Sequence, residues 1–286
     1  MEGIMKQILD NSSIKYSNIE RITNKLNEFT TENVCIIADF DGTITQGGDN
    51  TWKIVNNNKG VNREILQITQ DLKDYYQPIE NNTEISDEQK ESMMREWWIK
   101  QLNIYSQFEL HKQVIKDVIR TNDEIKIRDG ISWLFEICNE LDIPVIILSS
   151  GISNIIDELL EKEEINFPQT FIVSNQLTFD EEGFCKPINE DLIIHLENKN
   201  LDQIPSSILN QTGNRDKIIL LGDSLKDLNM VPKDKDHDTL KIGFLNDNNT
   251  HLREQFIKQF DIVIENNESS LDTIGKIIET IKEIQE

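Results

Sequence analysis

The sequence contains few cysteines and no long apolar run, and each shortage excludes a class of protein. Its 286 residues include three cysteines without a CxxC pair, which argues against a disulfide framework and indicates reduced thiols, as in the cytoplasm. No apolar run approaches the length of about 18 residues that a membrane-spanning helix needs. The polar N-terminus also lacks the apolar stretch of a secretory signal. We therefore expect a cytoplasmic protein without a membrane partner.

Basic residues are scarce as well. The chain has 29 lysines and arginines against 52 aspartates and glutamates, which gives a formal net charge of −23 at pH 7. Such a surface repels nucleic-acid backbones and anionic lipids, so we expect no nucleic acid polymer as a partner. It also repels a small anionic substrate. A phosphate site on this protein therefore requires local positive charge from a metal ion, a lysine or a helix N-terminus.

Short apolar runs that alternate with helical patterns predict an α/β fold. The runs at 34–38, 144–148 and 218–221 are bounded by polar segments, which is typical of strands buried on both faces of a parallel sheet. Weaker runs occupy 241–245 and 262–264. The alternation predicts a doubly wound, mostly parallel sheet. The predicted helices cover 18–29, 131–141, 152–160, 192–196, 252–260 and a closing segment, 270–285, with Ser269 or Ser270 as its cap.

One segment interrupts this alternation. From about residue 47 to residue 126 no buried-strand run occurs, and the apolar residues at 65–75 and 93–105 follow helical spacing. The chain length also suits one core domain with a smaller insertion. We therefore interpret residues 47–126 as a helical cap domain inserted into an α/β core formed by 1–46 and 127–286.

Polar residues follow three of the predicted strands. Asp39 and Asp41 come directly after the first run. Two carboxylates two positions apart point the same way on an extended chain, and their mutual repulsion favours a hard cation such as Mg²⁺ between them. Ser149 and Ser150 follow the second run and open a helix N-terminus that suits phosphate. Because ligands bind at the carboxyl ends of parallel strands, these groups are expected at one site.

The third run adds two further carboxylates, Asp223 and Asp227, and Lys199 could supply positive charge. Each motif alone has an ordinary interpretation, since Asp-x-Asp is usually a solvated turn and Ser-Ser-Gly a helix cap. Asp-x-Asp-Gly can also begin a calcium loop, but Asp39 follows a predicted buried strand rather than a helix. The placement of all three motifs directly after strand runs favours a common site.

At these residues the chain resembles the haloacid-dehalogenase-like phosphatases. Their first motif corresponds to 39–43, the second to Ser149, the third to Lys199, and the fourth to 222–224 with Asp227. The resemblance implies a Rossmann-like core of the haloacid-dehalogenase type, with the inserted helices as its cap. Over about residues 16–275 the chain also looks like the cytosolic pyrimidine 5′-nucleotidases of type III and their 7-methylguanosine-phosphate-specific relatives. The further matching segments are 75–80, 96–98, 142–145, 174–175, 179–181 and 240–247.

The resemblance implies a Mg²⁺-dependent 5′-nucleotidase that acts through an aspartyl-phosphate. Asp39 would be the nucleophile, and Asp41 the general acid and then the general base. Mg²⁺ would be held by Asp39, the backbone carbonyl of Asp41, and Asp223, and Asp227 would orient Lys199 or a metal-bound water. The implied phosphate-binding residues are Ser149, Ser150 and the catalytic Lys199.

Within the cap, the resemblance assigns base recognition to Glu80, Trp98 and Gln101. A carboxylate at position 80 accepts from an exocyclic amine, which cytosine and guanine both carry. Trp98 stands where pyrimidine-preferring members have Tyr and methylguanosine-preferring members have Trp. An indole is the best aromatic partner for the cationic N7-methylguanine ring, so we expect 7-methylguanosine monophosphate as a substrate beside CMP and UMP. Gln101 replaces a Ser of many relatives, and 52–59 is shorter and richer in Asn, so the base preference stays open.

Several alternatives remain at this stage. The same fold could act on another small phosphate ester such as phosphoserine, or could be a catalytically silent binding module. Trp97 and Trp98 could both belong to the core of the cap. An aspartyl-phosphate can also be intercepted by an alcohol, so we expect a nucleoside phosphotransferase side activity. We expect a monomer whose only partner is a small nucleoside monophosphate.

Overall fold

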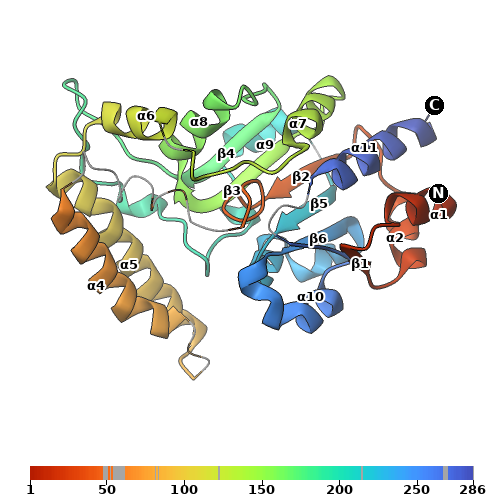
Figure 1. Ribbon diagram of the computed structural model, residues 1–286, viewed down its shortest axis with the longest axis horizontal. Coiled ribbons are helices and arrows are strands. Elements are labelled where there is room, and N and C mark those ends of the chain that lie inside the picture. Colours follow the sequence, from red (N-terminus) through yellow and green to blue (C-terminus); the bar gives the residue numbers. More distant parts are fainter. Residues whose placement is uncertain are drawn as a thin grey trace.

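The computed structural model describes residues 1–47, 51, 53, 62–80, 82, 84–121, 123–213, 215–266 and 270–285. At its centre, the described residues form a sheet of seven strands in the order β1-β7-β6-β5-β2-β3-β4 (Figure 1). β1 is antiparallel to β7, and all other neighbours are parallel, which confirms the predicted α/β class. The strands are β1 (Ile14–Tyr16), β2 (Val34–Ala38), β3 (Val145–Ile152), β4 (Thr170–Asn175), β5 (Lys217–Gly222), β6 (Thr239–Leu245) and β7 (Ile262–Glu265).

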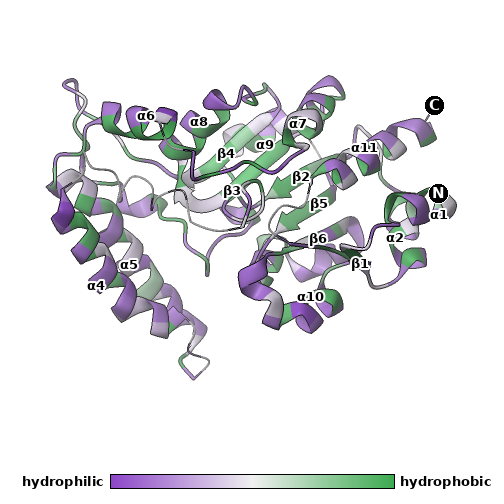
Figure 2. Ribbon diagram, in the orientation of Figure 1, coloured by the Kyte–Doolittle hydropathy of each residue, from purple (hydrophilic) through white to green (hydrophobic). Residues whose placement is uncertain are grey.

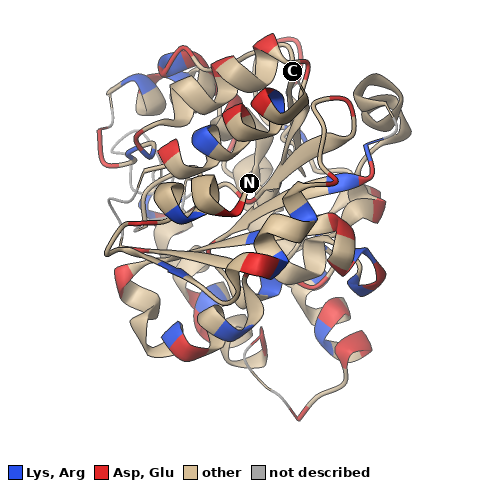
Figure 3. Cartoon of the chain, turned by 90° about the vertical axis from the view of Figure 1, so that its right-hand side faces the viewer, with Lys and Arg blue, Asp and Glu red and all other residues tan. Residues whose placement is uncertain are grey.

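Burial on both faces explains the apolar runs. In β2 every residue is buried: Val34, Ile36 and Ala38 belong to one core, while Cys35 and Ile37 belong to another on the opposite face. Successive side chains of a strand point to opposite faces, so a strand with both faces covered must be apolar at every position. Figure 2 shows the result as hydrophobic central strands between helices whose outer surfaces are hydrophilic. Figure 3 likewise shows the charged residues mainly on the outer helices and loops.

Helices cover both faces of the sheet, as the doubly wound prediction requires. The larger core packs under one set of helices, and the smaller cores pack under the other. The first set is α1 (Glu2–Ile8), α2 (Ile19–Leu26), α7 (Ile131–Glu140), α8 (Ser153–Lys162) and α11 (Asp272–Gln285). The second set is α9 (Ser206–Thr212) and α10 (Arg253–Gln259), with the 3₁₀ turns η2 (Leu201–Gln203), η3 (Leu225–Met230) and η5 (Asp247–Leu252). The 3₁₀ turns η1 (Glu190–Leu192) and η4 (Lys233–Asp238) have no buried residue.

The interrupting segment is helical, as its spacing predicts. α4 (Arg63–Glu80) and α5 (Asp87–Gln107) lie side by side as a hairpin beside the sheet, and α6 (Lys112–Thr121) packs on α8 (Figure 1). The hairpin has a small core of its own, in which the rings of Tyr76 and Trp97 stack with centroids 5.7 Å apart. The domain boundaries at 46/47 and 126/127 stay a prediction.

The predicted helix over 192–196 is wrong, and two strands were not predicted. The chain makes a 3₁₀ turn at Glu190–Leu192 and then becomes extended, because the Asn175 side chain accepts from the Ile194 N–H at 2.9 Å and donates to its carbonyl at 2.8 Å. β1 has three residues, and β4 carries polar Thr170 and Ser174, so neither forms a continuous apolar run.

The cap of the last helix and the state of the cysteines agree with the expectations from the sequence. The Ser270 hydroxyl accepts from the Asp272 N–H at 3.0 Å, at the start of α11, whereas Ser269 lies outside the described residues. Cys35, Cys138 and Cys185 are buried free thiols. Among the described residues, no helix combines the length and apolar character needed to cross a bilayer.

Candidate active site

The carboxyl ends of β2, β3 and β5 lie together, because β2 pairs with both of the other strands. A cavity of about 760 Å³ opens over these ends, between the sheet and the α4–α5 hairpin. Every residue predicted for the site lines this cavity except Gln101. Those residues are Asp39, Asp41, Glu80, Trp98, Ser149, Ser150, Lys199, Asp223 and Asp227.

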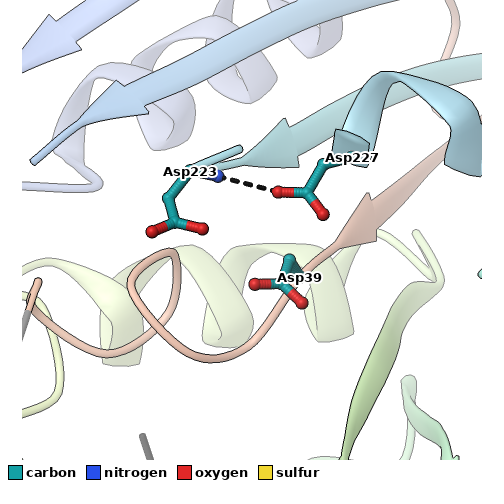
Figure 4. A group of neighbouring side chains, drawn as sticks. All are labelled: Asp39, Asp223 and Asp227. Carbon is teal, nitrogen blue, oxygen red and sulfur yellow. Dashed lines mark hydrogen bonds between the residues drawn. The ribbon is translucent and has the colours of Figure 1, made fainter. Parts of the chain in front are cut away.

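Three carboxylates from two distant parts of the chain form an acidic cluster (Figure 4). Asp39 follows β2, and Asp223 and Asp227 follow β5. One oxygen of each lies within 4.8 Å of the others. Asp227 is oriented by the backbone, since its Oδ2 accepts from the N–H groups of Asp223 at 3.1 Å and Ser224 at 2.9 Å. The bond from Ser224 belongs to a capping box at the start of the 3₁₀ turn η3, so a local motif fixes the spacing of the two acids.

Lys199 is the cation of this cluster. Its Nζ lies 2.7 Å from Asp39 Oδ1 and 2.6 Å from Asp227 Oδ1, and the side chain is buried. Burial lowers the pKa of Lys199, but the carboxylates of Asp227 and Asp39 outweigh that effect and raise the pKa overall. Lys199 is therefore an ammonium ion throughout the neutral range and holds the Asp39 carboxylate in place.

Burial also sets the protonation of the acids. It raises the pKa of Asp39 to about 7, against the opposing effect of Lys199. It raises the pKa of Asp223 well above its ordinary value, and the neighbouring Asp227 and Asp39 add to this shift. Full ionisation of the acids around one ammonium ion is therefore unfavourable, and a further positive charge between them would favour their ionised forms.

Asp41 lies two residues after Asp39, and its carboxylate is held by Thr51. The Thr51 N–H donates to Asp41 Oδ1 at 2.8 Å, and its hydroxyl donates to Oδ2 at 3.1 Å. Burial raises the pKa of Asp41 to about 6, although the bonds from Thr51 lower it. An acid with this pKa can both give and take a proton near neutral pH.

The C-terminal part of β3, Ser149–Ile152, lies beside Asp41 and is held by several hydrogen bonds. Ser149 Oγ accepts from the Gly151 N–H at 3.0 Å. The Ser150 carbonyl accepts from Asn175 Nδ2 at 2.7 Å, and the Gly151 carbonyl accepts from the Ser174 hydroxyl at 2.8 Å. A Cβ on Gly151 would lie 3.2 Å from Ser149 Oγ and 3.7 Å from Asp41 Oδ2, so the missing side chain leaves space beside both groups.

The hairpin supplies the opposite wall. Glu80 is the last residue of α4, and burial raises its pKa although Lys226 opposes the shift. The rings of Trp97 and Trp98 stack with centroids 6.2 Å apart, and Trp98 is the less buried of the two. Gln101 is only 1 % exposed and its Nε2 donates to Thr69 Oγ1 at 3.2 Å. The structure therefore places Gln101 behind the cavity wall rather than on it, because its amide is engaged inside the hairpin.

Comparison with known proteins decides the family. The model of the pyrimidine 5′-nucleotidase family (UMPH-1) matches residues 41–282. The chain belongs to this family. The 7-methylguanosine phosphate-specific 5′-nucleotidase of Gallus gallus is 31 % identical, over 96 % of this chain and 97 % of the relative. The enzyme of the same description from Homo sapiens is 32 % identical, over 92 % and 89 %. The chain is therefore a 5′-nucleotidase, a phosphoric monoester hydrolase.

Solved structures agree with this assignment. The crystal structure of cytosolic 5′-nucleotidase IIIB bound to cytidine superposes with a TM-score of 0.81 at 26 % identity, over 98 % of this nucleotidase and 99 % of that chain. A substrate-bound phosphoserine phosphatase has the same fold, with a TM-score of 0.53 at 18 % identity over 87 % and 98 % of the two chains. The fold of the core is therefore that of the haloacid-dehalogenase-like phosphatases.

The acidic cluster of this nucleotidase fits a divalent cation. Its ligand atoms are carboxylate oxygens from three residues, which hard cations prefer over nitrogen and sulfur donors. The loop beside it is shaped to match, since a Cβ on Gly42 would lie 2.2 Å from Asp223 Oδ2. Gly42 has a φ of +80°, and both facts require glycine at this position.

Sequence reasoning missed three residues around the site: Thr51, Arg128 and Asn246. Thr51 holds Asp41, and Arg128 and Asn246 bond to the loop that follows Asp39. None follows a predicted strand as part of a recognisable motif. The one available signal was Asn246, which directly follows the apolar run at 241–245.

Proposed function

We propose that this nucleotidase removes the 5′-phosphate of nucleoside monophosphates through an aspartyl-phosphate on Asp39. One observation carries the proposal: Asp39, Asp41 and Lys199 share a single cavity with Glu80 and Trp98. The first three residues suit phosphoryl chemistry, and the other two suit a base. The volume of about 760 Å³ is within the usual range for small-molecule sites.

The reaction proceeds in two displacements. A carboxylate oxygen of Asp39 attacks phosphorus, and the bond from phosphorus to the ribose 5′ oxygen breaks while Asp41 in its acid form gives that oxygen a proton. A water molecule then attacks the phosphorus, and Asp41 as the carboxylate takes a proton from it. The bond to Asp39 breaks, which releases inorganic phosphate and restores the carboxylate. The pKa of Asp41, about 6, suits both directions of proton transfer.

Positive charge must accompany these steps, because the substrate and the cluster are both anionic. Lys199 neutralises part of the negative charge and, with Ser149 and the Ser150 backbone, would hold phosphate oxygens. Asp39, Asp223 and the Asp41 backbone carbonyl would hold Mg²⁺. When bound, Mg²⁺ screens the repulsion between carboxylate and phosphate.

The hairpin would select the base. Glu80 would accept from an exocyclic amine, and Trp98 would stack on the base. The chicken and human relatives are named for 7-methylguanosine phosphate, and the solved structure at 26 % identity is bound to cytidine. We propose 7-methylguanosine monophosphate together with CMP and UMP as substrates, because a tryptophan favours a cationic ring.

The remaining expectations become part of the same proposal. The aspartyl-phosphate would also transfer its phosphoryl group to added nucleosides. The protein would act as a monomer on small molecules, and it would act in the cytoplasm, as a structural relative is named a cytosolic nucleotidase.

A phosphate-release panel tests this function. The substrates are 7-methylguanosine monophosphate, CMP, UMP, GMP, AMP, phosphoserine and p-nitrophenyl phosphate, each with Mg²⁺ and with EDTA. We expect turnover of the first three, loss of turnover in EDTA, and no turnover by Asp39→Asn. Preferred turnover of phosphoserine would instead support the alternative phosphatase, and no turnover of any substrate would support a silent binding module.

Base recognition needs a separate comparison. Glu80→Gln keeps the size of the side chain but weakens its acceptor character, and should reduce kcat/KM for CMP by at least about 10-fold. The same variant should hydrolyse p-nitrophenyl phosphate at the wild-type rate, because that substrate has no base. Equal losses on both substrates would show that Glu80 does not read the base.

A further inference from the structure

Arg128 is among the largest fully buried side chains of the described residues, and it carries a charge beneath the active site. Its side chain is 1 % exposed, and the guanidinium carbon lies 4.5 Å from the centroid of the Phe244 ring. A buried charge is costly unless hydrogen bonds compensate it. The acceptors that Arg128 contacts therefore indicate what the residue does.

Two of those acceptors are backbone carbonyls of the loop that follows the proposed nucleophile, and a third is the side chain of Asn246. Arg128 Nε donates to the Thr43 carbonyl at 2.8 Å, and Nη2 donates to the Gly42 carbonyl at 2.7 Å and to Asn246 Oδ1 at 2.6 Å. The guanidinium fork reaches these acceptors from one rigid plane, which the single ammonium group of a lysine cannot do. Arg128 thereby clamps the backbone of two consecutive residues.

Asn246 connects Arg128 to the acidic cluster by hydrogen bonds. Its Oδ1 accepts from Arg128, while its Nδ2 lies 3.0 Å from both the Gly42 carbonyl and Asp223 Oδ2. Asn246 is 1 % exposed and directly follows β6. The two side chains thus join the carboxyl ends of β2, β5 and β6 around a single carboxylate oxygen.

Arg128 also lies at the joint between the helical insertion and the core. It lies where the polypeptide returns from the helical insertion, and this return segment pairs with the outgoing one. Thr45 and Ile127 form an antiparallel bridge, Gln46 N–H donates to the Lys126 carbonyl at 2.8 Å, and Arg128 N–H donates to the Ile44 carbonyl at 2.9 Å. The joint between the insertion and the core is therefore bonded directly to the catalytic loop.

We propose that Arg128 and Asn246 are a positioning pair that holds the Asp223 carboxylate against the Gly42–Thr43 loop, so that the cation site is shaped before an ion binds. This inference rests on the proposed function, because it takes Asp223 as a ligand of a divalent cation. Neither residue is among those that line the cavity. Each acts through Asp223 and the loop.

Isothermal titration of Mg²⁺ into the metal-free protein tests the pair without any turnover. The variants are Asn246→Leu, which keeps the size of the side chain but removes its donor, and Arg128→Lys, which keeps the charge but not the fork. We expect each to weaken Mg²⁺ binding about 10- to 100-fold, as is typical when a group that orients a metal ligand is removed. Asp223→Asn, which alters a ligand itself, should abolish measurable binding.

Lys25→Met is the matched control. Lys25 is also a buried cation, bonded to Asp261 Oδ2 at 2.8 Å and to the Thr239 carbonyl at 2.7 Å, at the opposite end of β6 from Asn246. This variant should lose stability while it binds Mg²⁺ and turns over substrate as the wild type does. Unfolding curves of all variants confirm that the folded protein is being titrated.

A kinetic rescue separates positioning from a general structural defect. The loss of kcat/KM in Asn246→Leu should be largely recovered at a Mg²⁺ concentration raised about 100-fold, because the chemistry is intact once the ion is bound. If Asp223→Asn abolishes Mg²⁺ binding while Asn246→Leu and Arg128→Lys bind as tightly as the wild type, the positioning pair is refuted. If Asp223→Asn also binds as the wild type does, the metal site of the proposed function is wrong, and the pair is refuted with it.

Discussion

Because burial raises the pKa of Asp39, the proposed nucleophile, we expect the metal-free protein to become less stable as the pH rises from 4 to 8, and Asp39→Asn to remove part of this loss. Burial raises the pKa of Asp39 from its ordinary value of 3.8 to about 7. A carboxyl whose pKa is raised by folding binds its proton more tightly in the native state. Its contribution to stability is therefore full below pH 3.8 and is lost as the pH rises through 7.

The size of the effect follows from the two pKa values. Each pH unit between 3.8 and about 7 corresponds to about 1.4 kcal/mol for one proton, so Asp39 alone accounts for about 4 kcal/mol. An uncharged asparagine has no such titration. We expect Asp39→Asn to gain stability relative to the wild type by this order of magnitude between pH 4 and pH 8.

Urea unfolding in EDTA, followed by circular dichroism at several pH values, measures the difference. Asp202→Asn removes the same charge from an exposed position and is the control for net charge. Added Mg²⁺ should stabilise the wild type at pH 8 and shrink the advantage of Asp39→Asn, because a cation offsets the buried negative charge. A stability difference between Asp39→Asn and wild type that stays constant from pH 4 to 8 would refute the reasoning.

Three further predictions concern single side chains. Gly42→Ala should weaken Mg²⁺ binding and lower kcat at least 10-fold in a phosphate-release assay, because its Cβ would lie 2.2 Å from Asp223 Oδ2 at a φ of +80°. Trp98→Tyr should lower the ratio of kcat/KM for 7-methylguanosine monophosphate over CMP by about 2- to 5-fold, since tyrosine attracts a cationic ring less strongly. Asn175→Ala should cost about 2–3 kcal/mol in urea unfolding, because three hydrogen bonds to the Ser150 and Ile194 backbone are lost.

The sequence predicted best those site residues that directly follow strands buried on both faces. Asp39 and Asp223 follow apolar runs with no polar interruption, and parallel pairing of β2 with β5 necessarily brings such strand ends together. Lys199 has no such run before it, and was recognised chiefly from its order among the motifs. Its place in the cluster depends on the extended segment that Asn175 fixes at Ile194, which local periodicity does not encode.

Residues whose role arises only from tertiary contact were missed. Arg128 lies in a mixed polar segment that gives no sign of burial, and Thr51 gains its role by meeting Asp41 across ten positions of the chain. Gln101 shows the opposite case. Its correspondence to a Ser of many relatives suggested contact with substrate, whereas its side chain is turned into the hairpin toward Thr69. Side-chain direction on a helix depends on the neighbouring helix as well as on spacing.

The paired segments at Thr45 and Ile127 mean that the insertion leaves the sheet and rejoins it at neighbouring points. Because the two ends of the insertion lie next to each other, the length and sequence of α4 and α5 can change while the strand order of the sheet stays the same. Under the proposed function, selection for a new base can therefore act on α4 and α5 without disturbing the groups proposed to cleave the ester. Residues at the attachment, Arg128 foremost, and those where α6 packs on α8 must satisfy both parts at once.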